Sequence, residues 1–118
     1  MNEKLIRKSS SGLNILGVDF DGTLFSGPTE NYPIPGDPIW KIHEYVKNKK
    51  DNGWYIILWT CRGGRDLDLA LKKCKEYGIE FDYVNENHPE IIKRGYDHRK
   101  IFATIYLDDR NLNPITDI

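Results

Sequence analysis

The chain has 118 residues, of which 39% are hydrophobic and 30% charged, and its formal net charge is −1. This composition is typical of one globular domain, and the near-neutral charge argues against a protein whose main role is to coat nucleic acid or an anionic membrane. No stretch approaches the roughly 18 apolar residues of a membrane helix, and residues 1–12 lack the apolar core of a signal peptide. We expect a single domain over residues 1–118, with residues 1–12 as a polar tail, located in the cytoplasm and without membrane contact.

The first half of the chain predicts a strand, a loop and a helix. Residues 13–20 (LNILGVDF) form a nearly continuous apolar run that ends in acid, the pattern of a strand buried on both faces of a parallel sheet. A loop rich in Gly, Pro and Asn follows. Asp37 as N-cap and Pro38 in the first turn predict a helix that Gly53 ends. Its apolar face repeats at helical spacing and consists of Ile39, Ile42, His43 and Val46.

The second half continues the alternation. Residues 54–60 (WYIILWT) predict a second buried strand, and a second helix then runs toward Gly78 with Leu67, Ala70, Leu71 and Cys74 on its apolar face. Residues 81–87 (FDYVNEN) predict a short third strand, Pro89 opens a brief helix through about residue 94, and residues 101–109 (IFATIYLDD) predict the last strand. Strands and helices that alternate in this way indicate an α/β fold with a parallel sheet and right-handed crossovers.

The polar residues that suggest chemistry all lie at the carboxyl ends of predicted strands. They are Asp19 and Asp21 for the first strand, Thr60 for the second, Asn85 and Asn87 for the third, and Asp108 and Asp109 for the last. In parallel α/β sheets ligands bind at the carboxyl ends of the strands. Two carboxylates ~4 Å apart repel by about 4 kcal/mol at an effective dielectric near 20, so a cation is expected among them. Oxygen ligands without His or Cys favour Mg²⁺.

The second strand end also suits a phosphoryl group. The hydroxyl of Thr60 and the backbone N–H groups that follow, at Cys61 and Arg62, could bind its oxygens. Lys100 precedes the last strand and could supply a cation to the transferring group. A carboxylate nucleophile that attacks phosphorus would give an aspartyl-phosphate, while the second acid protonates the leaving alcohol and then activates water.

These residues resemble a known family. The segment 19–23 (DFDGT), Thr60, Lys100 and the segment 107–109 (LDD) are similar, in order, to the four motifs of the haloacid dehalogenase (HAD) superfamily. The resemblance covers residues 14–109 and implies a Rossmann-like three-layer sandwich with a central parallel sheet. Its first motif is the specific one. Lys93 is an alternative for the third-motif lysine, although the place of Lys100 before the last strand favours Lys100.

The resemblance also implies a role for each motif residue. Asp19 would be the nucleophile and a magnesium ligand, and Asp21 the general acid and base that lends its backbone carbonyl to the metal. Thr60 would bind phosphate and Lys100 would stabilise the intermediate. Asp108 and Asp109 would complete the magnesium site, and which of them contacts the ion directly stays open. An aspartate at position 21 is typical of the phosphatases of this superfamily.

The short connections leave the substrate open. Neither the loop after the first motif nor the segment after the third strand is long enough for a cap domain, so we expect a minimal, capless phosphatase acting on a phosphorylated small molecule. A homo-oligomer could supply a lid from a neighbouring subunit. Two alternatives are a phosphatase that acts on nucleic-acid ends through the same site and a non-catalytic phosphate-binding or interaction module on the same fold. The order of the motifs disfavours a response-regulator receiver.

Overall fold

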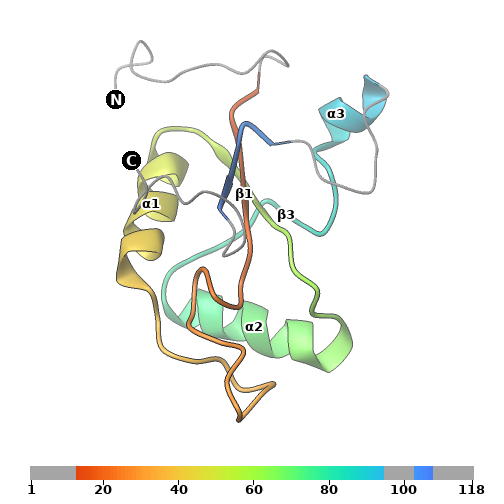
Figure 1. Cartoon of the computed structure of the whole chain (residues 1–118). Coiled ribbons are helices and arrows are strands. Elements are labelled where there is room, and N and C mark those ends of the chain that lie inside the picture. The colour runs from red at the N-terminus through yellow and green to blue at the C-terminus, as the bar shows by residue number, and fades with distance from the viewer. Residues whose placement is uncertain (1–12, 95–102, 108–118) are drawn as a thin grey trace.

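The computed structural model describes residues 13–94 and 103–107, which form an α/β fold around a four-stranded parallel sheet (Figure 1). The strands are β1 (Ile15–Val18), β2 (Tyr55–Leu58), β3 (Tyr83–Val84) and β4 (Ile105–Leu107), in the spatial order β3-β2-β1-β4. Every pairing is parallel. The predicted α/β class with a parallel sheet is therefore confirmed.

The central strand is β1, and its sequence explains its place. All four of its residues are buried, because β1 pairs with β2 on one side and β4 on the other while both of its faces are covered. Its alternate side chains enter two separate clusters of the core. A continuous apolar run is what such a strand requires.

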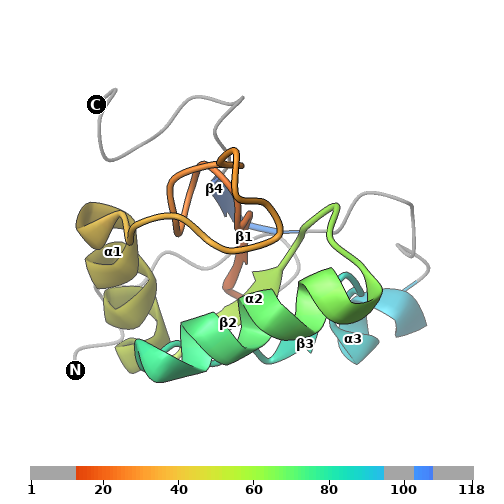
Figure 2. The ribbon, with the colours of Figure 1, turned by 90° about the horizontal axis from the view of Figure 1, so that it is seen from below.

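The helices cover the two faces of the sheet unequally. Helices α1 (Trp40–Asp51) and α2 (Gly64–Glu76) pack on the larger core cluster, which contains Leu16, Val18, Ile42, Val46, Ala70 and Cys74. The short helix α3 (Pro89–Lys93) places Ile91 with Ile15 and Ile57 on the opposite face. Figure 2, which looks along the strands, shows α1 and α3 on opposite sides of the sheet.

The helix ends agree with the sequence at the C-terminal side. Gly53 and Gly78 follow α1 and α2 within two residues and have φ values of 85° and 78°, the left-handed region that glycine adopts without strain. None of the described helices has the length and apolar character needed to cross a membrane.

The predicted start of α1 is wrong. The helix begins at Trp40, with Ile39 as its N-cap, and not at Asp37 and Pro38. Instead, Pro38 forms an antiparallel bridge with Phe25, and the N–H of Ile39 donates to the carbonyl oxygen of Leu24. The chain is thus tied to the segment after β1 before it can enter the helix.

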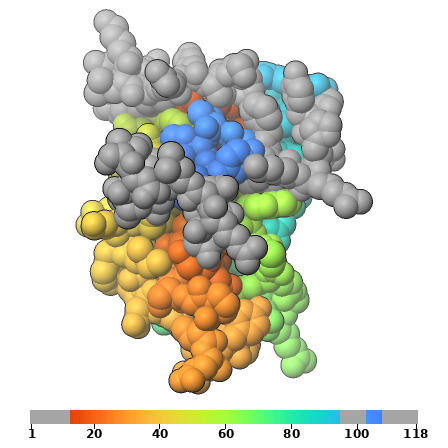
Figure 3. All heavy atoms as spheres, in the orientation of Figure 1, coloured from red at the N-terminus to blue at the C-terminus, as the bar shows by residue number. Residues whose placement is uncertain are grey.

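Residues 26–37 form a loop that closes on itself. At its base, the N–H of Ser26 donates to the carbonyl oxygen of Asp37 at 2.7 Å, and the N–H of Asp37 donates to Oγ of Ser26 at 2.9 Å. In Figure 3 this 26–37 loop forms the lower tip of the molecule. It leaves and re-enters the fold near the carboxyl ends of the strands, where the predicted site lies.

Candidate active site

Asp19 directly follows β1 at the carboxyl edge of the sheet. Its backbone N–H donates to the carbonyl oxygen of Leu107, the last residue of β4, at 2.9 Å, and its Oδ1 accepts a hydrogen bond from the N–H of Phe20 at 2.7 Å. A hollow of about 10 Å³, room for one water molecule, lies beside Asp19 and is also lined by Trp59 and Tyr106. The predicted nucleophile therefore lies where the ends of β1 and β4 meet.

Thr60 lies two residues beyond β2 at the same edge, held by a chain of hydrogen bonds. The N–H of Trp59 donates to the carbonyl oxygen of Val18 at 2.8 Å, and the N–H of Thr60 donates to Oδ1 of Asn85 at 2.8 Å. Asn85 in turn donates its N–H to Leu58 at 2.7 Å and has a φ of 52°, which asparagine tolerates better than most residues. These bonds join the ends of β1, β2 and β3.

The Thr60 hydroxyl is oriented by the residues that follow it. Its Oγ1 accepts a hydrogen bond from the N–H of Arg62 at 3.2 Å, so its own proton can be donated to a ligand. Cys61 is exposed between β2 and α2, and α2 begins at Gly64. The predicted phosphate-binding stretch thus connects a strand end to a helix start, where backbone N–H groups suit an anion.

The carboxylate of Asp21 forms an ion pair with the guanidinium group of Arg62. Nε of Arg62 lies 2.8 Å from Oδ2 of Asp21, and its Nη2 lies 2.9 Å from Oδ1. The Arg62 side chain is 2% exposed and that of Asp21 18%. The hydrogen bond with Asp21 raises the pKa of Arg62, although burial alone would lower it. A guanidinium group is therefore the partner of Asp21, and the magnesium ion expected near the two acids stays a prediction.

This pairing shows what Arg62 does in the fold. Sequence reasoning placed Arg62 among the substrate-binding residues, and its buried guanidinium also bonds two backbone carbonyl oxygens, those of Pro33 and Asp66. Four of the five N–H groups that a guanidinium carries are therefore occupied. The group of Arg62 predicted to bind phosphate was its backbone N–H, which in the structure donates to Oγ1 of Thr60, while its side chain binds Asp21.

Part of the predicted magnesium site lies within the described residues. Asp19 supplies a carboxylate of the kind that Mg²⁺ prefers. Both carboxylate oxygens of Asp21 bond Arg62. The group that Asp21 was predicted to lend to the metal is its backbone carbonyl, which these bonds do not involve. Within residues 13–94 and 103–107 no three acidic, histidine or cysteine side chains form a metal site. Asp108 and Asp109, which were predicted to complete it, lie outside the described residues. The magnesium site therefore stays a prediction, and Asp19 is the described carboxylate that could contribute to it.

Of the two candidate lysines for the third motif, the structure describes one, Lys93. Lys93 lies exposed in the last turn of α3, and Lys100 lies outside the described residues, as does the predicted tail of residues 1–12. The assignment of the third-motif lysine therefore stays a prediction.

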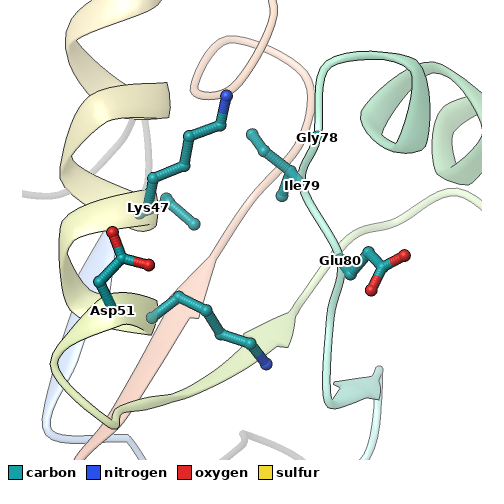
Figure 4. A pocket seen from close by; sticks show the side chains of 7 residues that line it. Lys47, Asp51, Gly78, Ile79 and Glu80 are labelled. Carbon is teal, nitrogen blue, oxygen red and sulfur yellow. The ribbon is translucent and has the colours of Figure 1, made fainter.

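A larger cavity lies away from this edge. It has a volume of about 310 Å³ and is lined by the last turns of α1 and by residues 78–80, which lead into β3. Figure 4 shows Lys47 and Asp51 on the helix side and Glu80 across from them. Because α1 ends just before β2 begins, this cavity lies toward the amino ends of the strands. It takes no part in the arrangement around Asp19.

The comparisons with known proteins agree with the fold. The solved structure of a conserved protein from Bacteroides thetaiotaomicron is 34% identical to this chain, with a TM-score of 0.70, and the match covers 85% of this chain and 78% of that one. The two chains belong to one family. No protein-family model matches the sequence, and no curated protein matches it significantly. The relationship to the Bacteroides protein establishes the architecture, and the chemistry of the edge rests on the residues themselves.

Proposed function

We propose that the protein is a magnesium-dependent phosphomonoesterase that works through an aspartyl-phosphate on Asp19. The observation that carries the proposal is the place of Asp19 at the carboxyl end of the central strand, joined through Val18 and Trp59 to the Thr60 stretch. This arrangement brings the carboxylate of Asp19 and the hydroxyl of Thr60 to one edge of the sheet, which supports the proposal. The similarity of the DFDGT segment to the first HAD motif supports the same reaction.

In the proposed reaction an oxygen of Asp19 attacks phosphorus while the bond to the leaving alcohol breaks. Asp21 gives a proton to the leaving oxygen and later takes one from the water that attacks the aspartyl-phosphate, which restores Asp19 and releases phosphate. The Thr60 hydroxyl donates to a phosphoryl oxygen, and Lys100 stabilises the intermediate. Mg²⁺, held by Asp19, the Asp21 carbonyl, Asp108 and Asp109, would neutralise negative charge on the transferring phosphoryl group.

The test is hydrolysis of p-nitrophenyl phosphate by the purified protein with Mg²⁺. We expect turnover that EDTA abolishes and added Mg²⁺ restores, and that Asp19→Asn lowers by about 10³-fold or more, because an amide cannot act as the nucleophile. Asp68→Asn, on an exposed position of α2, is the matched control and should keep wild-type turnover. Full activity of Asp19→Asn would remove the assignment of the nucleophile.

The substrate class is tested with the same protein. Sugar phosphates and a phosphorylated oligonucleotide are compared at two salt concentrations. Faster turnover of the oligonucleotide with a steep loss at high salt would favour action on nucleic-acid ends. Absence of turnover on every phosphate ester would favour a non-catalytic phosphate-binding module.

A further inference from the structure

The Arg62 side chain is enclosed by groups from three parts of the chain. The rings of Phe20 and Tyr32 lie 4.8 and 4.7 Å from its Cζ. Its Nη1 donates to the carbonyl oxygen of Pro33 at 2.8 Å and to that of Asp66, in the first turn of α2, at 3.1 Å. Together with the two bonds to Asp21, these contacts fix the position and orientation of the guanidinium group.

A buried ion pair of this kind is a poor way to gain stability, because desolvation of the two charges offsets most of their attraction. What a bidentate guanidinium–carboxylate pair does provide is a fixed orientation of the carboxylate plane. The carboxylate fixed here is that of Asp21, two residues after Asp19.

The same guanidinium also holds the 26–37 loop. Pro33 contacts Arg62 directly, and the hydroxyl of Tyr32 donates to Oδ2 of Asp66 at 3.1 Å, which attaches the loop to α2. At the other end of the loop, a Cβ built on Gly27 would lie 3.8 Å from Oδ1 of Asp21. The 26–37 loop therefore begins beside Asp21, and its later residue Pro33 is bound by Arg62, the ion-pair partner of Asp21.

We propose that Arg62 is a positioning residue that acts through Asp21: it fixes the Asp21 carboxyl group and holds the 26–37 loop beside it. The proposal rests on the proposed phosphatase activity, in which Asp21 transfers the proton. Lysine lacks the planar fork of a guanidinium group, so it fixes the orientation of a carboxylate plane less strictly.

The kinetic test uses leaving groups of different basicity. A proton donor matters more when the leaving oxygen is strongly basic, so Arg62→Met should lower kcat about 100-fold for phenyl phosphate and about tenfold for p-nitrophenyl phosphate, with KM changed less than about threefold. Arg62→Lys should lie between this variant and the wild type. Lys72→Met, which removes a positive charge from an exposed position of α2, should match the wild type.

A double-mutant cycle then separates positioning from a general structural effect. In an Asp21→Asn background, Arg62→Met should lower kcat by less than about threefold further, because Arg62 can no longer act through the Asp21 carboxyl group. An equal cost in both backgrounds, or equal losses on the two aryl phosphates, would overturn the proposal.

Amide hydrogen exchange tests the contact with the loop without any turnover. In Arg62→Met, amides of residues 26–37 should exchange about tenfold faster while those of β2 keep wild-type rates. Unchanged exchange in the loop, or equally faster exchange in β2, would contradict the proposal. If the wild type hydrolysed no aryl phosphate, the phosphatase assignment would fail, and the exchange comparison would still decide whether Arg62 holds the loop.

Discussion

Replacement of Gly36 by Ala should destabilise the protein through the base of the 26–37 loop. A Cβ at this position would lie 2.9 Å from the carbonyl carbon of Ser26 and closer still to the Ser26 carbonyl oxygen and Oγ. Side-chain carbons do not approach backbone this closely, so Ser26 and Gly36 must separate. Because the φ of Gly36 is not positive, the cost is steric and does not arise from backbone strain.

The magnitude follows from the bonds that such a separation breaks. Ser26 and Asp37 exchange two hydrogen bonds of 2.7 and 2.9 Å beside Gly36. At roughly 0.5–1.5 kcal/mol each, their loss should lower the free energy of unfolding by about 1–3 kcal/mol. The measurement is urea denaturation followed by tryptophan fluorescence, with the midpoint and the slope fitted separately.

Gly63→Ala is the control for this substitution. A Cβ on Gly63 would meet no atom within 4 Å, and the φ of Gly63, −138°, suits any residue. The free energy of unfolding should therefore fall by less than about 1 kcal/mol, because alanine is a poorer N-cap of α2 than glycine. If Gly36→Ala were as stable as the wild type, or no less stable than Gly63→Ala, the close packing at the loop base would be refuted.

Two further predictions concern buried titratable groups. Burial lowers the pKa of His43, whose Nε2 lies 2.8 Å from the carbonyl oxygen of Leu24, so the unfolded chain takes up a proton more readily than the folded one. The free energy of unfolding should therefore fall by up to about 1.4 kcal/mol per pH unit as the pH drops below about 6.5, down to the lowered pKa of the folded state. In urea titrations at several pH values His43→Gln should flatten this slope, and a slope that His43→Gln leaves unchanged would contradict the assignment. Burial also raises the pKa of Cys74 to about 12, whereas Cys61 is exposed. A thiol reagent near pH 8 should thus modify Cys61 at once and Cys74 only in denaturant, and equal rates in the native protein would contradict the burial of Cys74.

The elements that the sequence predicted well are those with a strong local pattern. The apolar run before Asp19 could only be a strand covered on both faces, and it is the central strand. The glycines after α1 and α2 marked the helix ends because their left-handed conformation is a local requirement.

The features that sequence reasoning missed depend on contacts between distant segments. Asp37 and Pro38 carry a helix-start signal, but Pro38 pairs with Phe25, and nothing in the local pattern shows this. The partner of Asp21 lies 41 residues away in Arg62. A signal for it did exist: Arg62 follows Thr60 at the same edge of the sheet, and a pair of acids at that edge requires a positive charge.

The most direct measurement of the central claim is to trap the covalent intermediate. The protein is mixed with p-nitrophenyl phosphate and Mg²⁺, quenched and treated with borohydride, which reduces an aspartyl-phosphate to homoserine, and the modified residue is located by peptide mass spectrometry. We predict homoserine at position 19, dependent on both substrate and Mg²⁺. Homoserine at another acid, or none at all in a protein that is turning over substrate, would contradict the assignment of Asp19.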